Sequence, residues 1–253
     1  MPKVLAAIGP DDVVLDIGGW AQPNRRADYV VDLLPYETRG TYGHIGDVPE
    51  RFTKDTWIVH DVSSRNPLPF IDKQFDFVIC SHTLEDIRDP IHLCAEIIRV
   101  GKRGYIETPS RLAESTFGVE NPRYAGYFHH RWLVVIDGDQ IVFRFKTDLL
   151  YESRCYHLPR RVLRRIPEEA LFTSLFWEGS FGYKEIVQVA EERLRHDLAA
   201  FVERHYPPAV WERMLDAMPR SGAEARLVAS RLRARARRSG SSGKIDMPDI
   251  EST

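Results

Sequence analysis

The sequence predicts an α/β fold in which an open, mostly parallel sheet is closed by an antiparallel hairpin. Strand and helix signals alternate between residues 12 and 146. The strand-like runs are short, rich in β-branched residues and almost continuously apolar, which is typical of strands buried in a parallel sheet. The alternation ends in RWLVVIDGDQIVFRFK, where turn residues separate the two apolar runs of a β-hairpin.

The expected strands follow one another along the first half of the chain. They are residues 12–17, 27–33, 56–62, 75–81 and 105–109, followed by the hairpin over 131–146. The helix before the fifth strand has the clearest start, because Asp89 suits its N-cap and Pro90 its first turn. The glycine-bounded sequence GKRG predicts a turn between this helix and the fifth strand.

The connection between the first and second strands is unusually short. About ten residues follow Gly18 before the next strand, whereas a parallel crossover normally needs a dozen or more, usually including a helix. The tripeptide Gln22-Pro23-Asn24 within this connection also opposes a helix. We therefore expect the first crossover helix to be shortened or absent.

The second half of the chain has a different character. Strand-like runs at 175–179 and 183–188 could extend the sheet or form a lid, and helical signals follow over 189–237. These signals end in dense arginine, which either binds phosphate, nucleic acid or another anionic polymer, or is a solvated helix end. We divide the chain into a core over 1–147, a lid or substrate region with a helical C-terminal extension over 148–238, and a flexible tail over 239–253.

The composition is that of an ordinary globular protein. Of the 253 residues, 43% are hydrophobic and 28% charged, and no apolar run approaches the length of a membrane span. The N-terminal apolar stretch is too short for a signal peptide. The three cysteines form no CxxC pair, which argues against a zinc site or a disulfide framework. We expect a soluble, cytoplasmic protein with no membrane partner, and we leave the oligomeric state open.

Aspartates end three successive expected strands. Asp16, Asp32 and Asp61 should lie with Ser81 at the carboxyl edge of the sheet, where open α/β sheets bind their ligands. Asp32 suits the vicinal hydroxyls of a ribose, and Asp61 could accept a hydrogen bond from an adenine amino group. The alternative is that each aspartate only caps a loop, but three at successive strand ends favour a shared ligand.

Two glycines follow the first of these aspartates. Gly18 and Gly19 permit a sharp turn and the close approach of a ligand. The pattern DxGGW differs from GxGxxG, so a pyrophosphate at a helix N-terminus is disfavoured. The sequence therefore predicts an adenosine without a pyrophosphate.

Four stretches together carry a family resemblance. They are VLDIGG, VVDL, HDVSSRNPLPFIDKQFDFVICSHTLEDIRDP and RVGKRGYIETPS. With them, residues 10–147 resemble the class I S-adenosylmethionine-dependent methyltransferases, most closely the methyltransferase type 11 group. The resemblance implies a Rossmann-like fold, methyl transfer, and S-adenosylmethionine as the cofactor.

The resemblance also implies roles for individual residues. The methionine end of the cofactor would be faced by Asp16, Gly18 and Gly19, with the adjoining Trp20. Asp32 would hold the ribose, and Asp61 and Val62 would hold the adenine. The far side of the pocket would be formed by Ser81 and His82. Trp20 stands where the family usually has a third small residue. With the first crossover also shortened, Arg25, Arg26 or loop amides are candidates for binding the cofactor's carboxylate.

The methyl acceptor should lie near the ends of the fourth and fifth strands. The fourth strand ends in CSHTLED, which is neither the Asn/Asp-Pro-Pro-aromatic motif of DNA amino-methyltransferases nor the Pro-Cys of cytosine-C5 enzymes. These absences move the prediction away from nucleobases. Residues 110–132 are rich in aromatic, histidine and arginine residues, and we expect them to form a loop over the pocket.

A hydroxyl acceptor needs a base, and three histidines are candidates. His130, His129 and His82 titrate near neutral pH, although each could instead be a hydrogen-bonded structural residue. If the chain is already extended at 129–130, neighbouring side chains point to opposite faces, so only one faces the pocket. We favour His130. A metal site from His82, Glu85 and Asp86 is conceivable, but a cap and a salt bridge are commoner, so we predict none.

The predicted function is therefore S-adenosylmethionine-dependent O-methylation of a small-molecule or carbohydrate-like acceptor. One alternative is an RNA- or ribosome-directed methyltransferase that uses the basic C-terminal helix, the only feature that suits nucleic acid. The other is a non-catalytic binding module with a methyltransferase-like fold.

Overall fold

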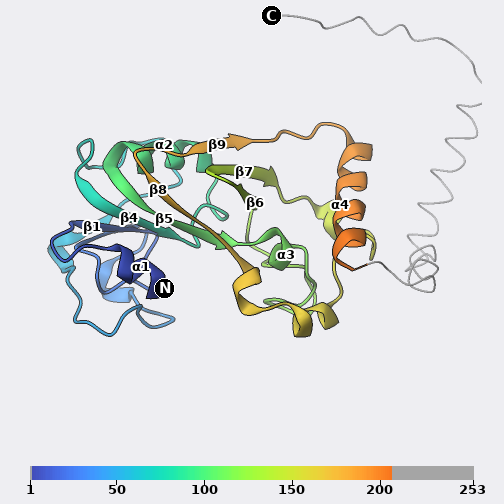
Figure 1. Cartoon of the computed structure of the whole chain (residues 1–253), viewed down its shortest axis with the longest axis horizontal. Coiled ribbons are helices and arrows are strands. Elements are labelled where there is room, and N and C mark those ends of the chain that lie inside the picture. The colour runs from blue at the N-terminus through green and yellow to red at the C-terminus, as the bar shows by residue number, and fades with distance from the viewer. Residues whose placement is uncertain (1, 207–253) are drawn as a thin grey trace, which may run out of the picture. The chain divides into compact units, whose positions relative to one another are not determined.

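The computed structural model describes residues 2–206, and its strands form two sheets (Figure 1). The main sheet has the order β3-β2-β1-β4-β5-β8. Its first five strands are parallel, and β8 runs antiparallel to β5. The strands are β1 (Val14–Ile17), β2 (Tyr29–Asp32), β3 (Trp57–Val59), β4 (Phe75–Ser81), β5 (Gly101–Pro109) and β8 (Phe172–Glu178). This arrangement confirms the predicted open, mostly parallel α/β sheet.

The two faces of the main sheet are covered differently. Helix α2 (Pro90–Val100) packs Leu93 and Ile97 into the larger core cluster, which also contains Val78. On the smaller cluster, Val4 of helix α1 (Pro2–Ala7) packs with Phe52 and other side chains. Strands β1 and β4 are apolar on both faces because both faces are covered, which is the pattern that predicted them.

Helix α2 begins as the sequence predicts. The backbone N–H of His92 donates to the side chain of the N-cap residue Asp89 at 3.0 Å, and Pro90 occupies the first turn. The predicted GKRG turn is wrong, because residues 101–104 already belong to β5. A Cβ at Gly104 would lie 2.2 Å from the carbonyl oxygen of Val78, so glycine here permits close strand packing.

No helix connects β1 to β2, as expected from the short connection. Within the described residues, loop 18–28 is instead hydrogen-bonded to loop 39–46. The N–H of Tyr42 donates to the carbonyl of Ala21 at 2.9 Å, and the N–H of Ile45 donates to that of Pro23 at 3.0 Å. The backbone N–H and carbonyl groups that would be hydrogen-bonded within a helix are thus hydrogen-bonded between two loops. The next connection contains the short 3₁₀ turns 36–38 and 54–56.

The predicted hairpin forms, but it does not close the main sheet. Strands β6 (Trp132–Asp137) and β7 (Gln140–Phe145) pair antiparallel, and β9 (Gly182–Glu185) joins β7 in a separate sheet. The antiparallel edge of the main sheet is β8, where Leu175 and Trp177 alternate with more exposed residues. The apolar face of the hairpin, with Trp132 and Phe143, packs into the larger core cluster, which also contains Trp177 of β8.

The remaining described elements are short or helical. Helix α3 (Arg111–Glu114) follows β5, three 3₁₀ segments lie at 148–151, 160–165 and 168–171, and α4 (Glu191–His205) falls within the predicted helical region. The arginine-rich stretch at 224–238 and the predicted tail at 239–253 lie outside the described residues. The predicted boundary at residue 147 stays a prediction. Among the described residues, no helix is both long and apolar enough to cross a membrane.

Gly18 gives a test of the turn that follows β1. Its φ is +76°, and an added Cβ would lie 2.0 Å from Oγ1 of Thr83. Gly18→Ala is expected to lower the free energy of unfolding by about 3 kcal/mol or more, because backbone strain and overpacking add. Urea unfolding measures the change.

The matched control is Gly138→Ala in the hairpin turn. Gly138 has a φ of +61°, but an added Cβ would meet nothing within 4 Å. Gly138→Ala should lower the free energy of unfolding by only about 1–2 kcal/mol, the penalty for a non-glycine residue in the left-handed conformation. Equal losses in the two variants would contradict the steric part of this explanation.

Candidate active site

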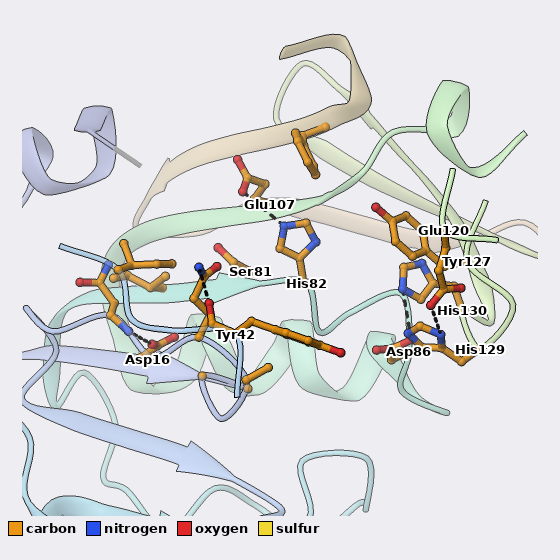
Figure 2. A pocket seen from close by; sticks show the side chains of 18 of the residues that line it. Asp16, Tyr42, Ser81, His82, Asp86, Glu107, Glu120, Tyr127, His129 and His130 are labelled. Atoms are coloured by element: carbon orange, nitrogen blue, oxygen red, sulfur yellow. Dashed lines mark hydrogen bonds and ion pairs between the residues drawn. The ribbon is translucent and has the colours of Figure 1, made fainter. Parts of the chain in front are cut away.

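A cavity of about 1020 Å³ opens at the carboxyl ends of β1, β4 and β5 (Figure 2). This is where an open α/β sheet binds ligands, and the volume is at the upper end of the roughly 300–1,000 Å³ of small-molecule sites. Asp16 lies at one end of the cavity, Asp86, His129 and His130 lie at the other, and Ser81 lies between them. The lining of the cavity thus has two polar ends.

Asp16 is the most strongly perturbed group at its end of the cavity. It is 4% exposed, and its carboxylate accepts the backbone N–H of Asn24 at 2.9 Å. Burial raises the pKa of Asp16 to about 7, and the charge of Asp32 contributes in the same direction. Asp16 therefore changes its charge near neutral pH, so the ionisation of this end depends on pH.

The two glycines beside Asp16 make the turn, but they approach the protein's own side chains. An added Cβ at Gly18 would clash with Thr83, and one at Gly19 would lie 2.5 Å from Oδ2 of Asp16. Both glycines also line the cavity. Packing against the protein's own side chains is therefore sufficient to require glycine at both positions, without the close approach of a ligand.

Two buried hydrogen-bond donors in the lining of the cavity have no partner. They are the hydroxyl oxygen of Ser81 and the side-chain nitrogen of Asn24, and both residues line the cavity. Leaving such atoms unpaired costs about 1–3 kcal/mol each, so a polar ligand that paired them would be favoured. Sequence reasoning predicted Ser81 but missed Asn24, whose loop has no motif.

The other predicted cofactor residues lie outside this cavity. Asp32 accepts the backbone N–H groups of Trp20 and Leu34 at 3.0 and 2.9 Å, and burial raises its pKa. Asp61 is exposed, and its pKa is lowered by hydrogen bonds from Ser63. Both carboxylates cap loops in this structure.

Trp20, Val62 and Arg26 are likewise engaged elsewhere. The indole N–H of Trp20 donates to Thr38 at 2.9 Å, and Val62 packs against the larger core cluster. The guanidinium of Arg26 binds Asp28 and nearby carbonyl oxygens. Within the described residues, neither Arg25 nor Arg26 lines the cavity. The predicted contacts of these residues with the cofactor stay predictions.

His82 follows β4 in a left-handed conformation, with a φ of +53°. Its Nδ1 lies 3.5 Å from Oε1 of Glu85, and its Nε2 lies 3.6 Å from Oε1 of Glu107. Burial opposes the charged imidazolium, but these two carboxylates outweigh it and raise the pKa of His82 to about 9. His82 is therefore a cation at neutral pH, which suits charge balance better than proton abstraction.

His130 is oriented by a buried carboxylate. Its Nδ1 lies 2.6 Å from Oε1 of Glu114, whose other oxygen accepts a hydrogen bond from Nζ of Lys146, also at 2.6 Å. All three side chains are at most 5% exposed. Tyr127 stacks on the His130 ring with centroids 4.5 Å apart. This packing leaves Nε2 of His130 as the free ring nitrogen.

Both neighbouring histidines line the cavity, whereas only one was expected to do so if the chain were extended there. Nε2 of His129 lies 3.8 Å from Oδ1 of Asp86, and Nε2 of His130 lies 3.6 Å from the same atom. The prediction assumed an extended chain, but residues 128–129 form a turn and β6 begins only at Trp132. A turn places both imidazoles on one side.

Comparison with known proteins finds a family match for a central part of the chain. Residues 44–106 match the family model described as a methyltransferase domain. Over these residues the chain is similar to a methyltransferase domain. This match confirms the predicted resemblance to the class I S-adenosylmethionine-dependent methyltransferases. No curated protein matches the chain.

Solved structures give weaker likenesses. YcgJ from Bacillus subtilis is 18% identical over 42% of this chain and 47% of its own, with a TM-score of 0.29. An S-adenosylmethionine-dependent methyltransferase from Mesorhizobium loti is 15% identical over 57% and 63%, with a TM-score of 0.31. One from Methanosarcina mazei is 17% identical over 54% and 86%, with a TM-score of 0.35. The match spans about half of YcgJ, and likenesses this slight assign no activity.

S-adenosylmethionine, the cofactor that the family implies, fits one end of the cavity. The unpaired polar atoms of Ser81 and Asn24, together with the carboxyl group of Asp16, suit the amino and carboxylate groups of its methionine moiety. At the adenosine end the fit is incomplete, because Asp32 and Asp61 do not line the cavity. Asp16, Asn24 and Ser81 are thus the residues that would hold the cofactor.

The buried pair of Lys146 and Glu114 is expected to stabilise the acceptor end. Lys146→Met should lower the free energy of unfolding by about 3–5 kcal/mol, because it leaves the Glu114 carboxylate buried without its cation. The matched control is Lys102→Met, which removes the exposed partner of Asp76 and should cost at most about 1 kcal/mol. Similar losses for both variants in urea unfolding would contradict the buried-pair explanation.

Proposed function

We propose that this methyltransferase transfers the methyl group of S-adenosylmethionine to an oxygen of a small-molecule or carbohydrate-like acceptor. The observation that carries the proposal is the cavity itself, which runs from Asp16 and its two neighbouring glycines to two histidines and an aspartate. When bound, the cofactor supplies an electrophilic methyl group. The chain's residues bind donor and acceptor and align them for in-line displacement.

The charge of the cavity supports a donor that carries positive charge. Six carboxyl groups line it: Asp16, Asp86, Glu107, Glu120, Glu168 and Glu169. No lysine or arginine of the described residues does. A sulfonium centre and an amino group are attracted by this field, whereas a phosphate-rich substrate is repelled.

The same field favours a neutral hydroxyl acceptor over nucleic acid. RNA binding gains most of its affinity from lysine and arginine contacts to phosphates, and this cavity offers none among the described residues. The aromatic ring of Tyr127 and the imidazoles of His129 and His130 are groups that contact sugar-like or aromatic hydroxyl compounds. The volume of about 1020 Å³ leaves room for an acceptor beside a cofactor, which favours an enzyme over a binding module.

Cofactor binding is expected to depend on the charge of Asp16. Below about pH 7 this carboxyl group is protonated, so the Kd for S-adenosylmethionine should rise by up to about tenfold per pH unit as the pH falls. Isothermal titration calorimetry from pH 5.5 to 8.5 measures this. Asp16→Asn should weaken binding by about 1–3 kcal/mol at pH 8 and remove most of the pH dependence.

The control for this titration is Asp139→Asn, in the exposed hairpin turn, which should leave both the Kd and its pH dependence unchanged. A well-folded protein that binds neither S-adenosylmethionine nor S-adenosylhomocysteine at any pH would refute the proposed function. A Kd independent of pH would refute only the role of Asp16.

Turnover is expected to require His130. His130→Gln should lower the rate of methyl transfer by about 10²–10⁴-fold with cofactor affinity nearly unchanged, because the side chain acts on the acceptor rather than on the donor. The rate is measured by mass spectrometry with an acceptor found in a screen of hydroxyl metabolites. His196→Gln, on the exposed face of α4, is the matched control and should retain full activity. Near-full turnover in His130→Gln, His129→Gln and His82→Gln would exclude all three predicted bases.

A further inference from the structure

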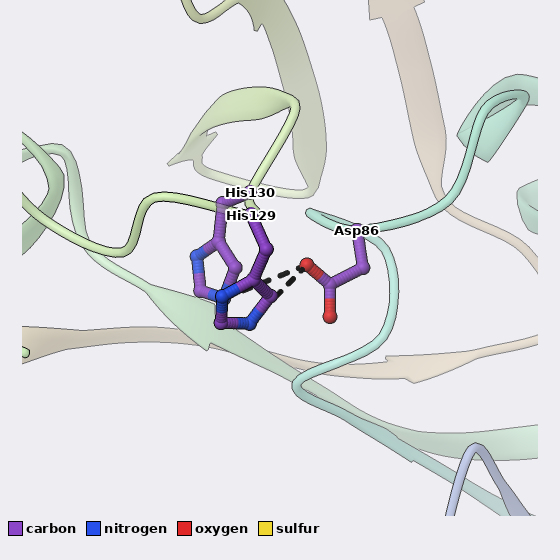
Figure 3. A group of neighbouring side chains, drawn as sticks. All are labelled: Asp86, His129 and His130. Atoms are coloured by element: carbon purple, nitrogen blue, oxygen red, sulfur yellow. Dashed lines mark ion pairs between the residues drawn. The ribbon is translucent and has the colours of Figure 1, made fainter.

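We propose that Asp86, His129 and His130 bind a divalent transition-metal ion at the acceptor end of the cavity (Figure 3). The prediction of no metal site is thereby revised, and the ligands differ from the His82, Glu85 and Asp86 set considered from the sequence. Asp86 comes from the segment after β4, and the two histidines come from the loop before β6. Only the fold brings these segments together.

The geometry of the three side chains suits a single ion. Their ligand atoms lie within 4.8 Å of one another, and both imidazole Nε2 atoms lie 3.6–3.8 Å from Oδ1 of Asp86. Ligand atoms on one ion with bonds of about 2.0–2.2 Å are about 2.8–3.6 Å apart at octahedral or tetrahedral angles. Small side-chain rotations would therefore complete the site. Figure 3 shows both rings on the same side, facing the carboxylate.

Direct pairing of the histidines with Asp86 explains this arrangement less well. Distances of 3.6 and 3.8 Å are too long for hydrogen bonds, and Oδ1 of Asp86 is buried without a hydrogen-bond partner. A buried, unpaired carboxylate oxygen is costly. An ion between the three groups would satisfy this oxygen and both imidazole nitrogens at once.

The surroundings of the histidines are those of metal ligands. A metal-bound histidine almost always donates its second ring N–H to a carboxylate, a carbonyl or water, which fixes the ring and its tautomer. Nδ1 of His130 is hydrogen-bonded to Oε1 of Glu114 at 2.6 Å, so this ring is fixed in the way a metal ligand's ring is. Nδ1 of His129 lies 3.8 Å from Oε1 of Glu120, beyond hydrogen-bond distance, and both Nε2 atoms are turned toward Asp86.

The donor set indicates which ions fit. Two imidazole nitrogens and one carboxylate suit Zn²⁺, Fe²⁺, Mn²⁺ or Co²⁺, whereas Mg²⁺ and Ca²⁺ prefer oxygen ligands. All three residues line the cavity, so the positions that the protein does not fill face the cavity. A metal site with unfilled coordination positions is typical of an ion that binds substrate. Structural ions, in contrast, have all of their coordination positions filled by protein ligands.

The role of the ion rests on the proposed function. An acceptor oxygen bound at the open positions would be fixed near the donor, and the ion would lower the pKa of its hydroxyl group. The hydroxyl proton passes to water, the oxygen forms a bond to the methyl carbon, and the bond between that carbon and sulfur breaks. The products are the methyl ether and neutral S-adenosylhomocysteine. With the ion in place, His130 serves as a ligand rather than as the base.

Metal binding is tested first, without cofactor or acceptor. The full chain, stripped with a chelator, is titrated with Zn²⁺, Mn²⁺ and Co²⁺ by calorimetry, and Co²⁺ is also followed by its visible absorption. We expect one ion per chain for at least one metal. His129→Gln, Asp86→Asn and His130→Gln should each weaken binding at least about tenfold, and Glu114→Gln about 10–100-fold by releasing the His130 ring.

The control variant for the metal titration is His196→Gln. This residue is exposed on α4 and does not line the cavity, so its loss should leave the metal affinity unchanged. His129 is the most informative ligand variant, because its half-exposed side chain can be replaced with little effect on folding, which circular dichroism checks. Absence of binding for all three metals, or equal binding by wild type and His129→Gln, would overturn the site.

The open positions are tested with catechol, a neutral compound that presents two adjacent hydroxyl groups. Its addition to the Co²⁺-loaded protein should shift the absorption bands, and an unchanged spectrum would overturn the role of the ion in acceptor binding. Neither measurement contains S-adenosylmethionine. A protein that binds metal but no cofactor would therefore refute the proposed function while supporting the site, and the reverse result would refute only the site.

Discussion

The buried carboxylate of Glu114 is the interaction on which the acceptor end of the molecule depends. It joins three segments: its own helix α3 after β5, His130 in the loop before β6, and Lys146 just after β7. The side chain is 1% exposed, so each of its two short contacts acts in a medium of low polarity. Gly126 approaches it so closely that an added Cβ would lie 2.5 Å from Oε2. The carboxylate therefore fixes how the second sheet meets the cavity.

A second constraint acts at the other end of the cavity, where the chain has no first crossover helix. Residues 18–28 must lead from β1 to the adjacent parallel strand without internal helical hydrogen bonds. Asp16 and the loop at 39–46 supply partners instead, with Asp16 accepting the N–H of Asn24. Asp16 holds this loop from a buried position, and that burial raises the pKa of its carboxyl group to about 7. The unusual backbone path and the perturbed acid have the same cause.

The sequence predicts what depends on local pattern. Apolar β-branched runs indicate the parallel strands, Asp89 and Pro90 indicate the start of α2, and the short gap after Gly18 indicates the missing helix. The pairing of the hairpin was not predictable in this way. The alternation of apolar and polar residues in the hairpin fits any antiparallel partner. That the hairpin pairs with β9 rather than with β5 is decided by packing between side chains that are distant in sequence.

The candidate site was predictable to a similar extent. His82, His129, His130 and Ser81 do line the cavity, because strand ends and a histidine-rich loop carry local signals. Glu114 and Lys146 carry none: they are 32 residues apart, and nothing in either segment indicates a buried charge. The turn at 128–129 decides the direction of both neighbouring histidines, yet it follows from no turn motif in GYFHHRW. Local pattern thus locates the groups, whereas tertiary contacts decide how they face one another.

The two polar ends of the cavity differ in how they hold charge, and this difference separates donor from acceptor. At the Asp16 end, a carboxyl group with a pKa of about 7 lies beside unpaired hydroxyl and amide groups, which suits a ligand with both amino and carboxylate groups. At the Asp86 end there are more carboxylates than buried cations, the buried cation being Lys146. The Nε2 atom of His130 is turned toward Oδ1 of Asp86, which has no hydrogen-bond partner. That combination suits a compact cation with directional bonds. His82, a cation at neutral pH between the two ends, offsets part of the negative charge. A positively charged donor and a metal ion can then occupy one cavity, because each is attracted to its own carboxylates and the two are kept apart.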